Sequence, residues 1–328
     1  MVTGRALLIS VLGLVAVAAC GRAAKPGPAP LVLERTILLK DVKGRIDHLA
    51  VDLEHNRLFV AELGNGTVEA LDLRGGGSVG RINGLKEPQG LAYLPERDEL
   101  AVASGGDGTV RFYRAADLTP LGVLRLGDDA DNMRLDQRSG RLVVGYGGGA
   151  LAVIDPATRT IVSRLPLPGH PESFRLDGAR VFVNVPDAGV IVVGDLDTGR
   201  VTATWKAAHA FNFPMAFDAA SGALAVVYRL PSRLAILDAA SGAARADLTT
   251  CGDADDVFFD PKRQLIYVSC GSGAVDALQV RPPYASTGHI ATRSGARTSL
   301  FVPELDRLFV AARAGGSEAA ILVYRPQP

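Results

Sequence analysis

The sequence is poor in the residue types on which many redox centres depend. Its 328 residues include one tryptophan, Trp205, together with three cysteines and five histidines. Quinoprotein dehydrogenases need repeated tryptophans, and multi-histidine copper sites need a cluster of histidines. A c-type haem needs a Cys-x-x-Cys-His motif, which does not occur here. These shortages argue against a redox function.

The chain also has no excess of charge of either sign. It carries 35 lysines and arginines and 35 aspartates and glutamates, so its formal net charge is zero. Nucleic-acid binding relies on basic side chains that neutralise phosphates. We therefore expect no nucleic-acid partner. The close spacing His-x-x-x-His, which would suggest a metal site, is missing as well.

The first twenty residues have the pattern of a targeting segment. Arg5 supplies a positive start, and Ala6–Ala18 is apolar but too short for a stable membrane span. The run ends Val17-Ala18-Ala19-Cys20, which resembles the lipobox of bacterial lipoproteins and implies cleavage before Cys20 and lipid on its thiol. An ordinary secretory signal, cut near the same small residues, is the alternative. Either way we expect export.

The N-terminal pattern also predicts how the chain is divided. Residues 1–19 form the signal peptide, and residues 20–30, rich in proline, alanine and glycine, form a tether that cannot pack a core. Residues 31–328 form the folded domain. With a lipid on Cys20, we expect a periplasm-facing protein of the bacterial cell envelope that contacts the membrane through the lipid only.

The two remaining cysteines, Cys251 and Cys270, flank two expected strands of one hairpin that turns at Pro261–Arg263. Positions that face each other across an antiparallel hairpin can come within disulfide range. An oxidising envelope compartment would let such a bond persist. We therefore predict a disulfide between them, with two unrelated buried thiols as the alternative.

A repeat of about forty residues fills the folded domain. Its seven aligned anchor positions, separated by gaps of 41 or 42 residues, are His48, Gly90, Asn132, Ser173, Pro214, Asp256 and Thr298. Each anchor opens a short strand-like run, and a turn and a second apolar run follow. Glycine and aspartate recur in the turns because tight hairpins require positive φ and Asx hydrogen bonds. The period predicts an all-β, seven-bladed β-propeller with four antiparallel strands per blade.

Two further features concern the ring as a whole. Leu31–Leu39 is an expected strand without a repeat unit of its own, whereas the last repeat stops after three strands. We therefore predict that the N-terminal strand completes the last blade and closes the ring. The aspartate that ends the first strand recurs in five of the seven units, which favours a structural role in the turn over ligand binding; these residues are Asp52, Asp136, Asp177, Asp218 and Asp260.

Three segments carry a resemblance to a known family. Ile266-Tyr267-Val268-Ser269 is followed by Gly271–Val275, and similar pairs occur at Leu58–Ala61 with Gly64–Val68 and at Val181–Asn184 with Gly189–Val192. They resemble the YVTN-type β-propeller repeats of bacterial and archaeal envelope proteins, here in a lipoprotein variant. The match covers about residues 31–326. It implies the fold and an envelope location, and it implies no particular activity.

The candidate site is the mouth of the central channel, where the loops that enter the first strands should converge. These loops carry unlike polar side chains, whereas purely structural repetition would make them alike. We predict that they bind a small molecule or an envelope protein without catalysing a reaction. The candidate ligand-binding residues are Arg45, Asp47, His48, Gln89, Asp131, Asn132, His170, Glu172, Asn212, Asp253, Asp255, Asp256 and Arg297.

The same mouth leaves a catalytic alternative open. Crowded carboxylates repel one another unless a cation or an arginine lies among them. A divalent cation, Ca²⁺ or another, is therefore a candidate cofactor, with Asp47, Glu172, Asp255 and Asp256 as candidate ligands. With His48 or His170 moving protons, such a site could act as a metal-dependent, lactonase-like hydrolase. Known lactonase-like propellers usually have six blades, which weakens this alternative.

Overall fold

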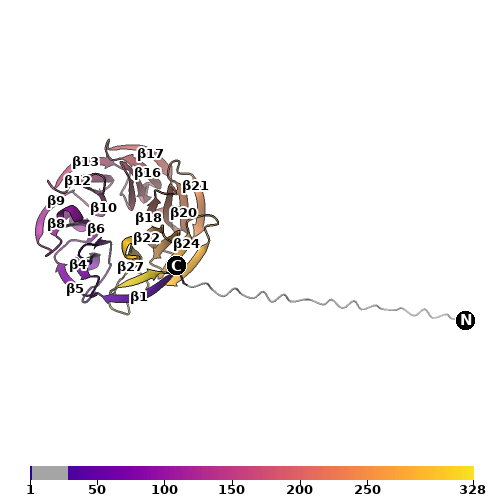
Figure 1. The fold of residues 1–328 in the computed structure, drawn as a ribbon. Coiled ribbons are helices and arrows are strands. Elements are labelled where there is room, and N and C mark those ends of the chain that lie inside the picture. Colours follow the sequence, from indigo (N-terminus) through magenta and orange to yellow (C-terminus); the bar gives the residue numbers. More distant parts are fainter. Residues whose placement is uncertain (2–28) are drawn as a thin grey trace.

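The computed structural model describes Met1 and residues 29–328 and shows seven four-stranded antiparallel sheets arranged as blades around a central axis (Figure 1). The predicted seven-bladed propeller is therefore confirmed. The predicted signal peptide, Cys20 and most of the tether lie outside the described residues. Among the described residues, no helix is long and apolar enough to cross a membrane.

Each blade runs from an inner strand at the axis to an outer strand at the rim, in chain order for the first six blades. The inner strands are β2 (Leu49–Asp52), β6 (Pro88–Leu94), β10 (Ala130–Asp136), β14 (Phe174–Asp177), β18 (Ala210–Asp218), β22 (Ala254–Asp260) and β26 (Thr298–Val302). The second strands are β3 (Arg57–Glu62), β7 (Glu99–Ser104), β11 (Arg141–Tyr146), β15 (Arg180–Val185), β19 (Ala223–Leu230), β23 (Leu265–Cys270) and β27 (Arg307–Ala312).

The third strands are β4 (Thr67–Asp72), β8 (Thr109–Arg114), β12 (Ala150–Asp155), β16 (Val190–Asp195), β20 (Ser232–Asp238), β24 (Ala274–Gln279) and β28 (Ala320–Pro326). The outer strands are β5 (Ser78–Ile82), β9 (Pro120–Arg125), β13 (Thr160–Pro166), β17 (Arg200–Lys206), β21 (Ala244–Thr249), β25 (Ser286–Ala291) and the N-terminal β1 (Leu31–Leu38). Short 3₁₀ turns lie at η1 (Leu63–Asn65), η2 (Pro95–Arg97), η3 (Gly105–Asp107), η4 (Pro186–Ala188) and η5 (Pro303–Leu305).

Burial follows from this stacking. The second strand of a blade is covered by neighbours on both faces, so β3 is buried along its whole length, whereas the outer strand β17 is mostly exposed. The core accordingly lies between adjacent blades. Phe59 of blade one, for example, belongs to the same apolar cluster as Leu100 of blade two. Each blade thus depends on the next for the burial that stabilises it.

The ring closes by pairing the two ends of the chain. In the seventh blade the strand order is β1-β28-β27-β26, and Leu31 of β1 lies opposite Pro326 of β28 (Figure 1). This confirms the predicted closure. The backbone N–H of Gln327 also donates to the carbonyl of Pro30, at 2.9 Å. Without β1, strand β28 would have an exposed edge of unpaired backbone groups.

The turn aspartates act within their turns, as the repeat suggested. The Asp52 carboxylate accepts the backbone N–H of His55, and Asp260 accepts that of Lys262, at 3.1 and 3.0 Å. These are Asx hydrogen bonds that hold the link between the first and second strands. Each inner strand begins at the channel mouth and ends at the opposite face of the ring. All such turns therefore lie on that opposite face.

A disulfide joins Cys251 and Cys270, with Cα atoms 5.8 Å apart. The bond was predicted, but the expected geometry needs a correction. In the ladder, the residue opposite Cys270 is Ala254 and not Cys251. Cys251 reaches Cys270 because the chain curls before β22, where Asp253 has a φ of 59°. The cross-link therefore ties the entering loop of blade six to its second strand.

Candidate functional site

Five of the seven entering loops share a backbone conformation although their side chains differ. Three residues before the anchor, the backbone is left-handed in five of the seven loops, at Glu87, Asp129, Phe211, Asp253 and Gly295. Only one of the five is glycine, the residue that adopts this conformation without steric penalty. The other four hold an unfavourable φ, a kind of strain that persists where the surrounding structure demands it. These five loops thus share one backbone conformation but carry unlike side chains.

One half of the mouth is an ion-pair network between blades five, six and seven. Arg229 pairs with Asp255 and approaches Asp253 at 3.6 Å. Arg297 lies 2.8 Å from Asp253 and 2.9 Å from Asp255. Two arginines therefore bracket two carboxylates. The guanidinium of Arg229 also lies 3.9 Å from the centre of the Phe213 ring, a cation–π contact.

Arg229 was missing from the sequence-based set because it does not lie on an entering loop. It is near the end of β19, the second strand of blade five, which at eight residues is longer than the usual six. This extension carries the arginine up to the mouth. The sequence signal would have been the longer apolar run of this repeat, which places Arg229 past the usual end of the strand.

Blade one contributes a second pair. Arg45 lies 2.8 Å from Asp47, whose carboxylate is almost completely buried, and Asp47 also lies 3.7 Å from His48. Desolvation raises the pKa of Asp47. The nitrogen that faces Asp47, His48 Nε2, also lies 3.0 Å from the Asn132 side-chain amide of blade three. His48 thus links Asp47 to Asn132 across the axis.

Blades two, three and four form the remaining part. His170 Nδ1 lies 2.7 Å from the carbonyl of Gly147, and its Nε2 lies 3.7 Å from Asp131. Interaction with Asp131 raises the pKa of His170 to about 9, so the ring is protonated at neutral pH. Asp129, which the sequence-based set left out, lies 3.7 Å from His170 and accepts a hydrogen bond from Gln89 at 3.3 Å.

Glu172 shows that these groups act on one another across the ring. Burial, reinforced by repulsion from Asp131 and Asp255, raises its pKa to about 8. Glu172 comes from blade four, Asp131 from blade three and Asp255 from blade six. The charges of Asp47, Asp131, Glu172 and Asp255 also act on Arg45. The structure therefore brings side chains from well-separated parts of the chain to one place.

Two predicted site residues are placed elsewhere. Asn212 is fully buried in the wall between blades four and five, where its Nδ2 donates to Asn184 Oδ1 at 3.1 Å and to the carbonyl of Val190 at 2.9 Å. It is a structural residue there. Asp256 lies below the mouth and lines the channel, where it accepts the backbone N–H of Ser299 at 2.8 Å. Burial raises the pKa of Asp256 to about 6.

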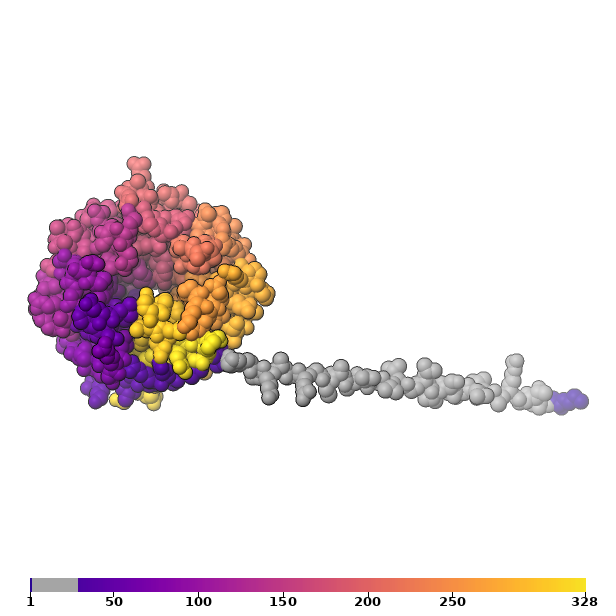
Figure 2. All heavy atoms as spheres, viewed as in Figure 1, coloured from indigo at the N-terminus to yellow at the C-terminus, as the bar shows by residue number. Residues whose placement is uncertain are grey.

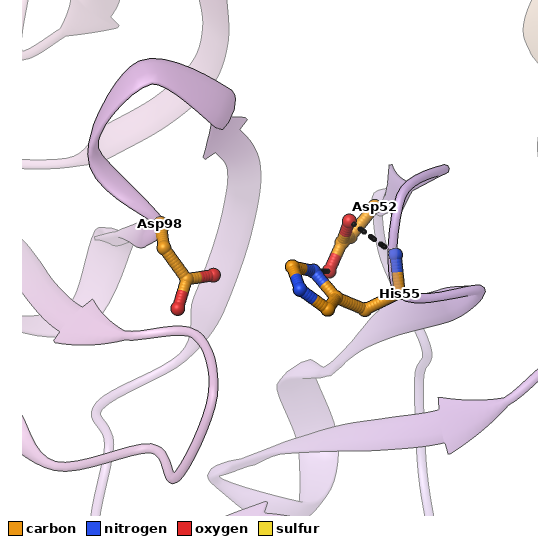
Figure 3. A group of neighbouring side chains, drawn as sticks. All are labelled: Asp52, His55 and Asp98. Atoms are coloured by element: carbon orange, nitrogen blue, oxygen red, sulfur yellow. Dashed lines mark hydrogen bonds and ion pairs between the residues drawn. The ribbon is translucent and has the colours of Figure 1, made fainter.

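The carboxylates suggested as metal ligands are not gathered into a ligand set. Asp47, Asp255 and Asp256 pair with Arg45, with two arginines and with a backbone N–H, respectively. Among the described residues, only Asp52, His55 and Asp98 bring three candidate ligand atoms within 4.8 Å of one another, on the opposite face of the ring (Figure 3). Of this candidate metal group, sequence reasoning had assigned Asp52 to turn structure and had not singled out His55 or Asp98.

An arginine already supplies positive charge to that group. Arg57 lies 2.8 Å from Asp52 and 3.3 Å from Asp98. Blade six repeats the arrangement, since Arg263 lies 3.0 Å from Asp260 and 2.6 Å from Asp306. The aspartates stand at equivalent repeat positions, and the arginines come from positions two residues apart in the repeat. Such recurrence is typical of a structural link between neighbouring blades. The residues therefore fit an arginine-centred ion pair better than a metal centre.

A cavity of about 390 Å³ lies along the axis below the mouth. The ring surrounds a central hollow in the space-filling view (Figure 2). Inner-strand residues of six blades line the cavity, from His48 and Asp256 near the mouth to Gln137 at the other end. Two arginines in its wall, Arg134 and Arg175, were not among the sequence-based candidates.

Comparison with known proteins supports the fold and goes no further. No family model matches the sequence, and no curated protein matches it. Among solved structures, a chain from Kuenenia stuttgartiensis hydrazine synthase has a TM-score of 0.77 at 16% identity, covering 87% of this chain and 97% of that one. A chain of a mitotic checkpoint complex has the same TM-score and identity, with both chains covered completely. Such low identity shows only the shared architecture: this chain has the fold of a β-propeller.

Proposed function

We propose that the protein is a non-catalytic binding protein of the bacterial cell envelope, and that the mouth of its channel takes a small ligand bearing a cationic group. The observation that carries this proposal is the convergence of six carboxyl groups and four cationic groups from different blades at the channel mouth. The groups are Asp47, Asp129, Asp131, Glu172, Asp253, Asp255, Arg45, Arg229, Arg297 and His170.

The charge balance favours a cation over an anion at the mouth. Carboxyl groups outnumber cationic side chains. Burial is the main cause of the raised pKa values of Asp47 and Glu172, and repulsion from Asp131 and Asp255 adds to it. A ligand ammonium would relieve the repulsion. The mouth groups are also recessed, since the side chains of Asp47 and Asp255 are 3% and 14% exposed. A small molecule can reach them more easily than a flat protein surface.

Binding is favoured over turnover by the way the carboxylates are paired. Asp253 and Asp255 are each held by arginines, and Asp47 is held by Arg45. An ion-paired carboxylate is a weak general base. His170, with a pKa of about 9, is protonated at neutral pH and cannot accept a proton there.

The test is a thermal-shift and calorimetric comparison of alkyl diamines with dicarboxylates of equal length, using residues 29–328. We expect stabilisation by the diamine, and a gain in diamine affinity between pH 7 and pH 9 as Glu172 ionises. Glu172→Gln should reduce that gain to the part that comes from loss of the His170 charge toward pH 9, and Asp255→Asn should weaken binding. Asp197→Asn, an exposed aspartate paired with Arg138 on the rim, is the matched control. Equal responses to both ligand classes would contradict the proposal.

The envelope location has independent support. The disulfide between Cys251 and Cys270 is of a kind that persists in oxidising compartments. The chain enters the domain at Pro30, on the face opposite the mouth, because Gln327 bonds to both Pro30 and Arg263 there. A lipid at Cys20 would therefore leave the mouth directed away from the membrane. The resemblance to YVTN-type repeats agrees with this location.

Mass spectrometry of the mature N-terminus tests the lipid, and fractionation of cells that express wild type or Cys20→Ala tests the anchor. We expect the wild type in the membrane fraction and Cys20→Ala in the soluble envelope fraction. Recovery of both proteins in the same fraction, with an unmodified N-terminus, would contradict lipid anchoring.

A metal-dependent hydrolase is the second candidate, and Glu172 is the observation in its favour. With a pKa of about 8, it could exchange a proton near neutral pH beside Asp131. Metal analysis of the purified protein and of Asp255→Ala, together with lactone and ester assays, tests this candidate. Turnover that requires a divalent ion and is lost in Asp255→Ala would replace the binding proposal.

A further inference from the structure

Seven side chains form a ring at one level of the channel, two residues beyond each anchor. In five blades they are small or apolar, and in the adjacent blades three and four they are arginines. The ring consists of Ala50, Ala92, Arg134, Arg175, Ala216, Phe258 and Leu300. All except Ala216 line the axial cavity. The two arginines therefore depart from the structural repeat at neighbouring positions.

Neither arginine has a carboxylate partner within 4.0 Å among the residues that the structure describes. Arg134 donates to the carbonyl of Met133 at 2.7 Å. Arg175 donates to Ser173 Oγ at 3.2 Å and to the carbonyl of Phe174 at 2.9 Å, both from the same nitrogen. A guanidinium has five N–H donors, so most of them remain available to the cavity.

This lack of carboxylate partners distinguishes the two channel arginines from three other enclosed arginines. Arg57, Arg229 and Arg263 are similarly enclosed, and each of them pairs with two carboxylates. Desolvation and the charge of Arg134 lower the pKa of Arg175 to about 9, as expected for two crowded cations. An anion between them would compensate both charges.

The rest of the cavity wall indicates the chemistry of such an anion. Asp256 is the only carboxylate among the lining residues, against two arginines, so the wall carries a positive excess. One residue further along the strands, toward the face opposite the mouth, the lining consists of the partly exposed Val51, Tyr93 and Leu135, followed by Gln137; Phe258 and Leu300 add apolar surface at the level of the arginines. A ligand entering from that side would meet apolar side chains first and the arginines deeper in.

We propose that the axial cavity binds an amphipathic carboxylate, with the carboxylate on Arg134 and Arg175 and the apolar body against the inner strands. The volume of about 390 Å³ lies within the range of small-molecule sites. Arginine suits this role because its planar fork matches a carboxylate in two parallel hydrogen bonds. This site differs from the mouth in position and in ligand charge, so it does not depend on the function proposed above.

Calorimetry with octanoate, octanol and inorganic phosphate tests the inference on residues 29–328. We expect octanoate to bind and octanol to bind at least about tenfold more weakly, because hydrogen bonds to a charged group contribute that much or more. Arg134→Gln and Arg175→Gln should each weaken octanoate binding by about tenfold or more. Arg114→Gln, an exposed arginine paired with Asp117, is the matched control and should bind as wild type does.

Three outcomes would overturn the inference: equal binding of octanol and octanoate by the wild type, binding of phosphate without octanoate, or unchanged octanoate affinity in both channel variants. If a channel variant does not fold, the comparison of octanoate with octanol in the wild type still decides. Diamine binding at the mouth is measured separately, so loss of one site leaves the other testable.

Discussion

The disulfide allows a stability prediction that can be worked out from the structure. We expect that the double substitution Cys251→Ala/Cys270→Ala lowers the free energy of unfolding without changing the fold. Both sulfur atoms are buried in the apolar cluster between blades five and six. The cross-link closes a loop with a sequence separation of 19 residues. In the chain-entropy model, its main effect is to restrict the unfolded chain.

For a loop of this length the model gives about 3 kcal/mol at 25 °C. Unfolding of about 300 residues carries an entropy of about 0.6 kcal/mol per kelvin, so the midpoint should fall by about 5 °C. Loss of the two buried sulfur atoms adds on the order of 1 kcal/mol each through poorer packing. The total therefore lies at about 3 to 5 kcal/mol.

Differential scanning calorimetry of wild type, both single variants and the double variant measures the effect. Either single substitution already removes the whole cross-link, so the double variant should be little less stable than either single one. Wild type reduced under denaturing conditions and refolded with reductant should lose about the entropic share alone. A loss below about 1 kcal/mol in the double variant, or additive losses in the single variants, would refute the reasoning.

Three further predictions follow from the described contacts. Burial raises the pKa of Glu62 from the ordinary value of 4.5 to about 7, so its contribution favours folding below pH 4.5 and is lost as pH rises through 7; Glu62→Gln should flatten this loss in urea titrations between pH 4 and pH 8. Arg263→Met leaves the buried Asp260 without its cation and should destabilise by about 3 to 5 kcal/mol in the same assay, whereas Arg114→Met should change stability by less than about 0.5 kcal/mol. Removal of residues 29–38 exposes the edge of β28, so the shortened chain should aggregate in size-exclusion chromatography or, where it stays monomeric, be cleaved more readily by protease. The first prediction is contradicted if the difference in unfolding free energy between wild type and Glu62→Gln does not change with pH. The second is contradicted if Arg263→Met leaves the unfolding free energy unchanged, and the third if the chain without β1 is a stable monomer.

Most of the fold could be predicted because local features of the sequence define the repeat. A spacing of 41 or 42 residues, alternating apolar runs and turn glycines do not depend on distant parts of the chain. The same holds for Leu31–Leu38, which has no repeat unit of its own and therefore had to pair with the incomplete last repeat. Which residues face each other across neighbouring strands was harder to predict from the sequence. The curl before β22, which sets Ala254 and not Cys251 opposite Cys270, depends on one left-handed residue, Asp253.

The candidate site was predictable only in part, because side-chain direction is not a local property. The sequence places both Asn212 and Asp255 in entering loops, and the structure includes them near the starts of strands β18 and β22; Asn212 points into the wall between two blades, whereas Asp255 points to the mouth. Arg229 reaches the mouth from a different strand because β19 is longer than its counterparts. Such placements depend on how neighbouring blades pack, so they cannot be predicted from the sequence of one repeat.

The sequence by itself determined the seven-unit architecture, the closure by the N-terminal strand and the disulfide, since each follows from spacing along the chain. Tertiary structure alone decided which charges meet. It set Arg229 beside Asp255, gathered Glu172 with Asp131 and Asp255, and left Arg134 and Arg175 without carboxylate partners in the described part of the chain. The physical reason is that ring closure brings residues some forty positions apart, or multiples of that, to one axis, where electrostatic energy depends on a few ångströms.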